Sequence, residues 1–253
     1  MGAFDDISLA YDNTIDWNSR LSQEIPFLLS LLDNPKEKRV LDMACGSGRH
    51  SVSLAEHGAQ VIGLDMSRTM IQAAKKHAES SSVNPTFVIA DMVDVDRVVD
   101  GSFDLVICLG NSLALLNSLE SVRSVVKTLY GLLNDGGSFV AQVLNFEEIH
   151  WTGFRSFPMK TGRLSDGTEV TFSRQFEHTD YPDSSTLIMS VFKSNEGEWT
   201  SEVSTQKVLN LKYDLMNDAL TDAGFEHIEF FSDYVRSPFD RKENRNMVIH
   251  SVK

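Results

Sequence analysis

The sequence predicts an α/β fold: a doubly wound, mostly parallel sheet of seven strands that carries helices on both faces and ends in an antiparallel strand. The first observation behind this prediction is that short apolar runs alternate with longer amphipathic stretches from residue 39 to residue 145. Such alternation is typical of parallel strands joined by helical crossovers. The second is that a helical pattern and two further apolar runs close the chain after residue 211, which indicates a final antiparallel hairpin.

Each expected element follows from its apolar spacing and from the residues that end it. Asn34 and Pro35 close the first helical pattern, Gly58 closes the second, and Ser67 is placed to cap the third. The expected strands of the sheet lie at 39–44, 61–65, 86–90, 103–109, 137–145, 227–234 and 247–252. The expected helices lie at 15–32, 52–57, 67–79, 113–133 and 212–222.

Between the fifth strand and the returning helix, the pattern changes to a period of two. Residues 169–173 and 187–192 alternate in this way and are separated by Asp, Ser, Gly and Asn turns, which predicts an antiparallel insertion of three strands over 168–208. We therefore expect three parts in the chain. They are an N-terminal helical cap (1–37), a core (38–145 and 211–253) and an antiparallel β insertion (146–210).

Charge and composition exclude several classes of protein. The 36 acidic and 23 basic residues give a net charge of −13, which opposes binding to a nucleic-acid backbone. Cys45 and Cys108 lie in apolar or glycine-rich runs without further ligands at metal spacing, so we expect no metal and no disulfide. No apolar run is long enough to span a membrane, and residues 1–6 are acidic. We expect a soluble cytoplasmic protein. The sequence leaves open whether it forms a homo-oligomer.

The turn after the first strand carries the chemistry. Gly46 and Gly48 fall where a strand must turn sharply into a helix, and glycine allows both a positive φ and a close approach of the backbone to a ligand. A pair of glycines in such a turn also serves packing alone. In a Rossmann-like sheet this turn lies at the carboxyl edge, where nucleotides bind.

Two aspartates narrow the ligand. Asp65 ends the second strand, where nucleoside sites place a carboxylate that accepts hydrogen bonds from ribose hydroxyls; the alternative is a cap for the next helix. Asp91 ends the third strand and is followed by Met92. The carboxylate suits the amine of an adenine and the methionine suits its ring; the alternative is that Asp91 is only a turn residue. The dinucleotide fingerprint needs a third glycine, but Gly48 is followed by Arg, His and Ser, which argues against NAD.

These motifs resemble a known family. Residues 40–48, Asp65, 91–92 and especially 106–112 (Val-Ile-Cys-Leu-Gly-Asn-Ser) are similar to the glycine/sarcosine N-methyltransferase branch of the class I S-adenosylmethionine-dependent methyltransferases. The likeness extends through nearly the whole chain, including an antiparallel insertion after the fifth strand. It implies S-adenosylmethionine as the cofactor.

The resemblance also implies that N-terminal aromatic and arginine side chains close over the cofactor, at Tyr11, Trp17 and Arg20. Trp17 and Arg20 share one helical face, where Trp17 suits the cationic sulfonium and Arg20 suits the carboxylate of the cofactor. The alternative is that Trp17 only anchors the helix by packing. The residues expected at the cofactor are Tyr11, Trp17, Arg20, Ala44, Gly46, Gly48, Asp65, Met66, Asp91, Met92, Leu109 and Asn111.

One departure from the family concerns the acceptor. The glycine methyltransferases hold their substrate's carboxylate with an arginine just after the fifth strand, and Leu144 stands in that place here. A leucine cannot form a bidentate carboxylate clamp, so glycine specificity does not carry over. Arg155, Arg163 and Arg174 of the insertion are candidate substitutes, between which the sequence does not choose.

The chain shows no constellation for acid–base or nucleophilic catalysis. We interpret His50 as a solvent-facing helix residue, Cys108 as an inert core thiol and 241–245 as a solvated hairpin tip. Because the sulfonium already activates the methyl group, the protein mainly has to align the acceptor and exclude water. We expect Asn111 nearest the reacting methyl as a positioning residue, with Phe146, Trp151 or Arg174 of the lid-like insertion near the substrate.

The sequence therefore predicts methyl transfer from S-adenosylmethionine to a small molecule, most simply at an amine nitrogen. The alternatives are an O-methyltransferase, a non-catalytic sensor of S-adenosylmethionine or a nucleoside, and an NAD-dependent oxidoreductase.

Overall fold

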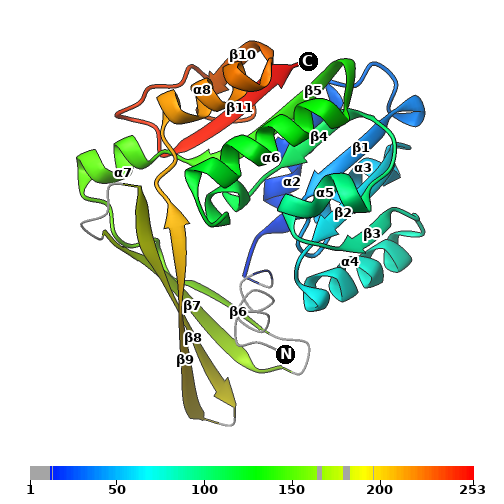
Figure 1. The fold of residues 1–253 in the computed structure, drawn as a ribbon. Coiled ribbons are helices and arrows are strands. Elements are labelled where there is room, and N and C mark those ends of the chain that lie inside the picture. Colours follow the sequence, from blue (N-terminus) through cyan, green and yellow to red (C-terminus); the bar gives the residue numbers. More distant parts are fainter. Residues whose placement is uncertain (1–11, 13, 164–166, 179–182, 196) are drawn as a thin grey trace.

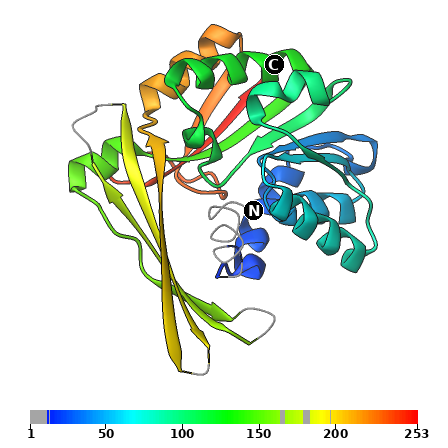
Figure 2. The same ribbon diagram turned by 60° about the horizontal axis from the view of Figure 1, so that its bottom comes forward.

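The computed structural model describes residues 12, 14–163, 167–178, 183–195 and 197–253. These residues form a seven-stranded sheet and a separate four-stranded sheet. In Figures 1 and 2 the four-stranded sheet extends away from the helix-covered sheet as a long ribbon. No helix among the described residues combines the length and the apolar character needed to cross a membrane.

The larger sheet confirms the predicted fold class. Its strand order is β10-β11-β5-β4-β1-β2-β3. β1 to β5 pair in parallel, whereas β11 runs antiparallel to both β5 and β10. The strands are β1 (Arg39–Met43), β2 (Gln60–Asp65), β3 (Thr86–Ile89), β4 (Phe103–Cys108), β5 (Leu133–Leu144), β10 (Glu226–Phe231) and β11 (Asn246–Val252).

Helices cover both faces of this sheet because successive strand residues point to opposite sides. Leu105 of β4 packs with Leu28 and Leu54 from α2 and α3, whereas the next residue, Val106, packs with Leu129 from α6 in the other apolar cluster. The helices are α2 (Trp17–Leu29), α3 (Arg49–Glu56), α4 (Arg68–Ser81), α5 (Val95–Val98), α6 (Leu119–Leu132), α7 (Phe146–Thr152) and α8 (Tyr213–Ala223).

The helix expected at 113–133 is interrupted. A 3-10 helix spans Ser112–Leu115, and α6 begins only at Leu119. The interruption has a local cause: Ser118 is extended, and its hydroxyl accepts a hydrogen bond from the Ser121 N–H at 3.1 Å, which starts a new helix.

The insertion has four strands rather than the three that the sequence predicted. They run in the order β6 (Lys160–Arg163), β7 (Glu169–Glu177), β8 (Ser184–Asn195) and β9 (Glu198–Leu209), each antiparallel to the next. The missed strand is β6. None of its four residues is buried, so it lacks the alternation of buried apolar side chains that identifies a strand in a sequence. Its strand conformation depends on its pairing with β7.

Candidate active site

The parallel strands β1, β2, β3 and β4 all end on one edge of the sheet, and the predicted site residues follow those ends. Between β1 and α3 the backbone turns through three left-handed residues, with φ of 53° at Ala44, 55° at Gly46 and 74° at Gly48. The turn is fixed to the next strand, because the Cys45 N–H donates to the Leu64 carbonyl at 2.9 Å. The expected glycine turn is therefore present at the carboxyl edge.

Asp65 joins this turn to the end of β2. Its Oδ2 accepts a hydrogen bond from the Gly46 N–H at 2.9 Å, and its Oδ1 accepts one from the Ser67 N–H at 2.8 Å. The N-cap of α4 is Ser67, whose hydroxyl accepts from the Met70 N–H, so Asp65 is not that cap. A carboxylate accepts hydrogen bonds only and offers about four lone-pair positions, so Asp65 is a group of the kind that binds hydroxyl donors.

Apolar side chains stand exposed after three of the parallel strands that end at this edge. Met66 follows β2 and is 70% exposed, Val93 follows β3 and is 46% exposed, and Leu115 follows β4. Met92 is half-buried instead, with its sulfur 3.9 Å from that of Cys108. Asp91 accepts a hydrogen bond from the Val93 N–H at 3.2 Å and caps a short 3-10 helix. An exposed apolar rim beside carboxylates suits a ligand with an aromatic ring.

Asn111 links the ends of β4 and β5. It has a φ of 66°, its N–H donates to the Gln142 carbonyl at 2.9 Å, and its Oδ1 accepts from the Leu144 N–H at 2.8 Å. The side-chain carbonyl is thus committed to the fold, and the amide nitrogen is the part suited to meet a ligand. Leu109, two residues before Asn111, is buried.

The described residues of the predicted N-terminal cap lie against the glycine turn, and Tyr11 falls outside the described residues. The Asp12 carboxylate accepts a hydrogen bond from the Ser47 hydroxyl at 2.6 Å. The Arg20 guanidinium lies 5.1 Å from the centre of the Trp17 ring, and one of its nitrogens is 3.7 Å from where a Cβ on Gly110 would be. Arg20 therefore reaches the end of β4.

His50 is buried, and the interpretation of it as solvent-facing was wrong. It is 6% exposed, its Nε2 is hydrogen-bonded to Glu24 Oε2, and its ring meets that of Trp17 edge-on at 5.8 Å. Glu24 Oε1 also accepts from Arg20 Nε at 2.8 Å. The cause is the packing of α2 on α3, which places the first turn of α3 under the cap.

Cys108 is fully buried, as expected of a core thiol, and burial raises its pKa. Among the described residues, no group of three or more His, Cys, Asp or Glu side chains is arranged to hold a metal ion.

A cavity of about 320 Å³ adjoins these residues. It runs along the carboxyl edge from the end of β4, past β5 and β11, to the loop after β10, and α2 and the insertion form its other walls. Leu144 and Arg174 line it, whereas Arg155, Arg163, Phe146 and Trp151 do not. The residues that line it are Arg20, Gln23, Glu24, Gly110, Asn111, Gln142, Leu144, Phe157, Arg174, Ser232, Asp233, Tyr234, Asn246 and Val248.

Sequence reasoning missed several of these residues, among them Gln142, Asp233 and Asn246. Their hydrogen bonds show how the site is joined: Gln142 Oε1 accepts from the Gly110 N–H at 3.0 Å, and its Nε2 donates to Asn246 Oδ1 at 3.2 Å. The strand order supplies the missing signal, because β11 lies next to β5. Asn246 at the start of β11 is opposite Leu144 at the end of β5.

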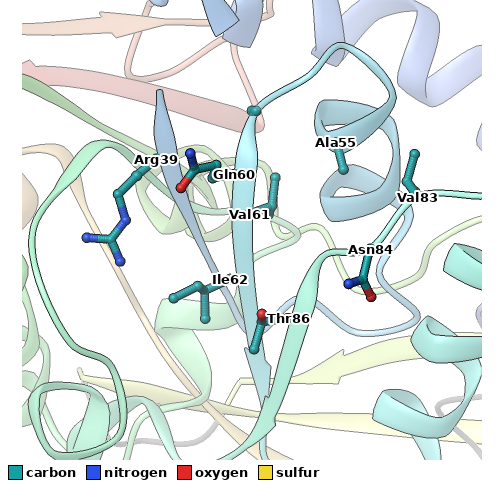
Figure 3. Close-up of a pocket in the computed structure, with 9 residues that line it drawn as sticks. Arg39, Ala55, Gln60, Val61, Ile62, Val83, Asn84 and Thr86 are labelled. Atoms are coloured by element: carbon teal, nitrogen blue, oxygen red, sulfur yellow. The ribbon is translucent and has the colours of Figure 1, made fainter. Parts of the chain in front are cut away.

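A second cavity, of about 560 Å³, opens at the opposite edge, near the starts of β1, β2 and β3. Figure 3 shows Arg39 and Ile62 on one side of β2 and Ala55, Val83 and Asn84 on the other. The Arg39 guanidinium is used within the fold, since it donates to the carbonyls of Ser102 and Asp100. None of the predicted site residues lies there, and ligands of open α/β sheets bind at the carboxyl edge.

Comparison with known proteins supports the family that the sequence resembles. Residues 40–137 match the family described as "Methyltransferase domain". The glycine/sarcosine N-methyltransferase of Parasynechococcus marenigrum (strain WH8102) is 28% identical over 97% of this chain and 82% of its own length. That of Aphanothece halophytica is 36% identical over 58% of this chain, but the match spans only 55% of that relative. These matches support a class I S-adenosylmethionine-dependent methyltransferase.

The fold of this methyltransferase agrees with solved structures. A S-adenosylmethionine-dependent methyltransferase from Clostridium acetobutylicum ATCC 824 superposes with a TM-score of 0.77 over 94% of this chain and 92% of that one, at 16% identity. CalS10, an amino pentose methyltransferase from Micromonospora echinaspora, superposes with a TM-score of 0.75 over 97% of this chain and 95% of that one, also at 16% identity.

The residues at the carboxyl edge fit S-adenosylmethionine, the cofactor of the family. A Cβ built on Gly46 would meet none of the described residues within 4 Å, so the described part of the chain leaves space beside this turn. Asp65 offers acceptors for ribose hydroxyls, and exposed Met66 and Val93 offer apolar contacts for a ring. The carboxylate acceptor, the space beside the turn and the apolar rim thus agree with a nucleoside that carries an amino-acid arm.

Asp42, at the end of β1, gives this methyltransferase a pH-dependent stability. Its carboxylate is buried and accepts from the Ser51 hydroxyl at 2.6 Å, and burial, with a further effect of the Asp65 charge, raises its pKa from 3.8 to about 6. The native state therefore binds this proton more tightly than the unfolded state does. The destabilisation begins as pH rises above about 4 and is complete above about 6.

We expect Asp42→Asn to stabilise the protein at pH 8 by up to about 3 kcal/mol, because asparagine still accepts the Ser51 hydrogen bond without a buried charge. The gain should shrink as pH falls from 6 to 4. Urea unfolding of both proteins across pH 4–8 measures it, and a gain that is equal at all pH values would contradict this account.

Proposed function

We propose that this methyltransferase transfers the methyl group of S-adenosylmethionine to an amine nitrogen of a small molecule. The observation that carries the proposal is the cavity along β4, β5, β11 and β10. At one end it is lined by Gly110, Asn111 and Arg20, and β4 at this end is the neighbour of β1, after which the cofactor turn lies. An acceptor held there has its reactive end beside the cofactor. The names of the two curated relatives support a nitrogen acceptor.

When bound, S-adenosylmethionine supplies a methyl group that its sulfonium has already activated. The chain's own residues have to bind the cofactor, orient the acceptor and exclude water. We assign the ribose hydroxyls to Asp65, the adenine to Asp91 and Met92, and the amino-acid arm to Arg20 and Trp17. The assigned contacts also include Tyr11, Ala44, Gly46, Gly48, Met66, Leu109 and Asn111.

On the acceptor side we assign Asn111 the role of a positioning residue, since its amide nitrogen can donate to the substrate or cofactor. The N-terminal cap (1–37) and the insertion (146–210) act in this proposal as the cover over the core (38–145 and 211–253). Arg20 and Arg174, one from each, line the same cavity, which supports a shared role in closing it.

Asp65→Ala should weaken the binding of S-adenosylhomocysteine by about 1–3 kcal/mol, because ribose hydroxyls lose a charged acceptor. Titration calorimetry measures the change. Asp94, which carries an exposed carboxylate paired with Arg97, provides the matched control, and Asp94→Ala should leave the affinity unchanged. Equal affinities for the Asp65 variant and the wild type would remove Asp65 from the site.

Transfer itself is tested with methyl-labelled S-adenosylmethionine and a panel of amines and alcohols. The proposal predicts label in at least one amine. Label only in alcohols would make the protein an O-methyltransferase, and tight cofactor binding without transfer to any acceptor would make it a sensor.

A further inference from the structure

Two of the described residues that line the acceptor cavity are cationic, and they come from different parts of the chain. Arg20 belongs to α2 and forms an ion pair with Glu24 at 2.8 Å, and Arg174 belongs to β7 of the insertion. We propose that Arg174 binds an anionic group of the methyl acceptor, so that the acceptor is an amine with a carboxylate or phosphate several bonds from the reacting nitrogen. The inference rests on the proposed function, because it assigns the substrate class of the same cavity.

The length of the cavity argues for an acceptor larger than glycine. The lining residues run from Gly110 after β4 to Asp233 after β10, and the strand order places three inter-strand steps between those strands. At about 4.8 Å per step, this edge spans roughly 14 Å. The volume of about 320 Å³ corresponds to the share of roughly ten water molecules. An acceptor of five heavy atoms would leave much of it to water.

Arg174 is held in an orientation that suits a planar anion. Its guanidinium carbon lies 4.4 Å from the centre of the Phe157 ring, and its backbone carbonyl accepts from the Phe157 N–H at 3.0 Å. Arg174 also lies opposite Met189 in the β7–β8 pair. A guanidinium that lies over an aromatic face can direct N–H groups past the edge of the ring, where carboxylate or phosphate oxygens can bind in a bidentate manner.

The other walls direct an anion to Arg174. Leu144 at the end of β5 offers no hydrogen bond from its side chain, and the proposed function assigns Arg20 to the amino-acid arm of the cofactor. At the far end, burial acts to raise the pKa of Asp233, but the N–H groups of Ser237 and Val235, each 3.0 Å from its Oδ1, hold that pKa below its usual value. Asp233 therefore stays ionised and repels an anion from the β10 end.

The test measures acceptor binding to the protein saturated with S-adenosylhomocysteine, by calorimetry and without turnover. The probes are glycine, 4-aminobutyrate, 6-aminohexanoate, 6-aminohexyl phosphate and hexylamine. We expect 6-aminohexanoate or the phosphate to bind at least about 10-fold more tightly than glycine and hexylamine, the lower end for a charge-assisted hydrogen bond. The comparison of these two probes distinguishes a carboxylate from a phosphate.

Arg174→Gln should remove this preference and leave the affinity for hexylamine unchanged, and Arg174→Lys should restore part of it. Arg155→Gln and Arg163→Gln are the matched controls, because both arginines are exposed parts of the insertion outside the cavity. These two variants should bind all probes like the wild type. A merely structural role of Arg174 would change hexylamine binding as well, so that result would overturn the inference.

The inference also fails if glycine binds most tightly, if no anionic amine binds, or if Arg174→Gln behaves like the two controls. The proposed function is judged separately by label transfer. Transfer to amines with no effect of Arg174→Gln on any affinity keeps the function and rejects this acceptor class. Arg174-dependent binding without any transfer keeps the assigned site and rejects the methyl transfer.

Discussion

Replacing Glu24 with alanine is expected to lower the free energy of unfolding by about 3–5 kcal/mol, as when one partner of a buried ion pair is removed. Glu24 is 6% exposed and accepts from Arg20 Nε while it also contacts His50 Nε2. Its loss leaves the buried His50 imidazole without this partner. Because α2 docks on the first turn of α3 through this pair, the cap should loosen at the glycine turn too.

The pH dependence gives this prediction a second readout. Burial acts to raise the pKa of Glu24, but the hydrogen bond and charge of His50, with a further effect of Arg20, lower it below 4.5. The carboxylate therefore stabilises the fold at pH values above about 4.5, and this contribution is lost as pH falls through the lower native pKa. The difference between wild type and Glu24→Ala should accordingly shrink in acid.

Urea unfolding at pH 7 and pH 4 measures both effects. Ser22→Ala is the matched control, since Ser22 is an exposed residue of the same helix. A Glu24 variant that loses no more stability than the Ser22 variant would contradict the assigned role of the pair. A double-mutant cycle with His50→Ala then isolates their interaction.

Alanine at Gly48 is expected to destabilise the protein by about 2–5 kcal/mol, which combines the left-handed backbone with overpacking. Gly48 has a φ of 74°, and a Cβ there would lie 2.7 Å from the Ala74 Cβ and 2.9 Å from the Phe87 ring. The residue is therefore a packing glycine, at which α3 and α4 approach each other closely.

Alanine at Gly46 should act differently, although the two glycines belong to one turn. Gly46 also has a positive φ, but none of the residues that the structure describes lies within 4 Å of its Cβ position, so we expect only about 1–2 kcal/mol of lost stability. The added methyl group enters the space assigned to the cofactor, so the affinity for S-adenosylhomocysteine should fall. Thermal unfolding and calorimetry of both variants test this division; equal loss of stability in the two variants would contradict it.

The fold and the cofactor turn could be predicted because local patterns carry them. Apolar runs mark the strands, and Gly46 and Gly48 mark the turn. The pairing of Glu24 with His50 could not be predicted, because it joins two helices and no local sequence pattern specifies how those helices pack. His50 in a first helical turn is ordinarily exposed, and here the docking of α2 buries it.

The acceptor cavity shows the same limit. Gln142, Asp233 and Asn246 are far apart in the sequence and meet because β11 inserts between β5 and β10. The sequence supplied three arginines as candidates for the acceptor, and only the three-dimensional arrangement separates Arg174 from Arg155 and Arg163.

The central claim is that the carboxyl edge of this sheet binds S-adenosylmethionine through the turn after β1 and the carboxylate after β2. Its most direct test is titration of the protein with S-adenosylhomocysteine and, separately, with NAD. We predict one site per chain for S-adenosylhomocysteine and an affinity for NAD that is weaker by at least about 100-fold, which corresponds to roughly 2.7 kcal/mol. Binding of NAD that equals or exceeds that of S-adenosylhomocysteine would contradict the account.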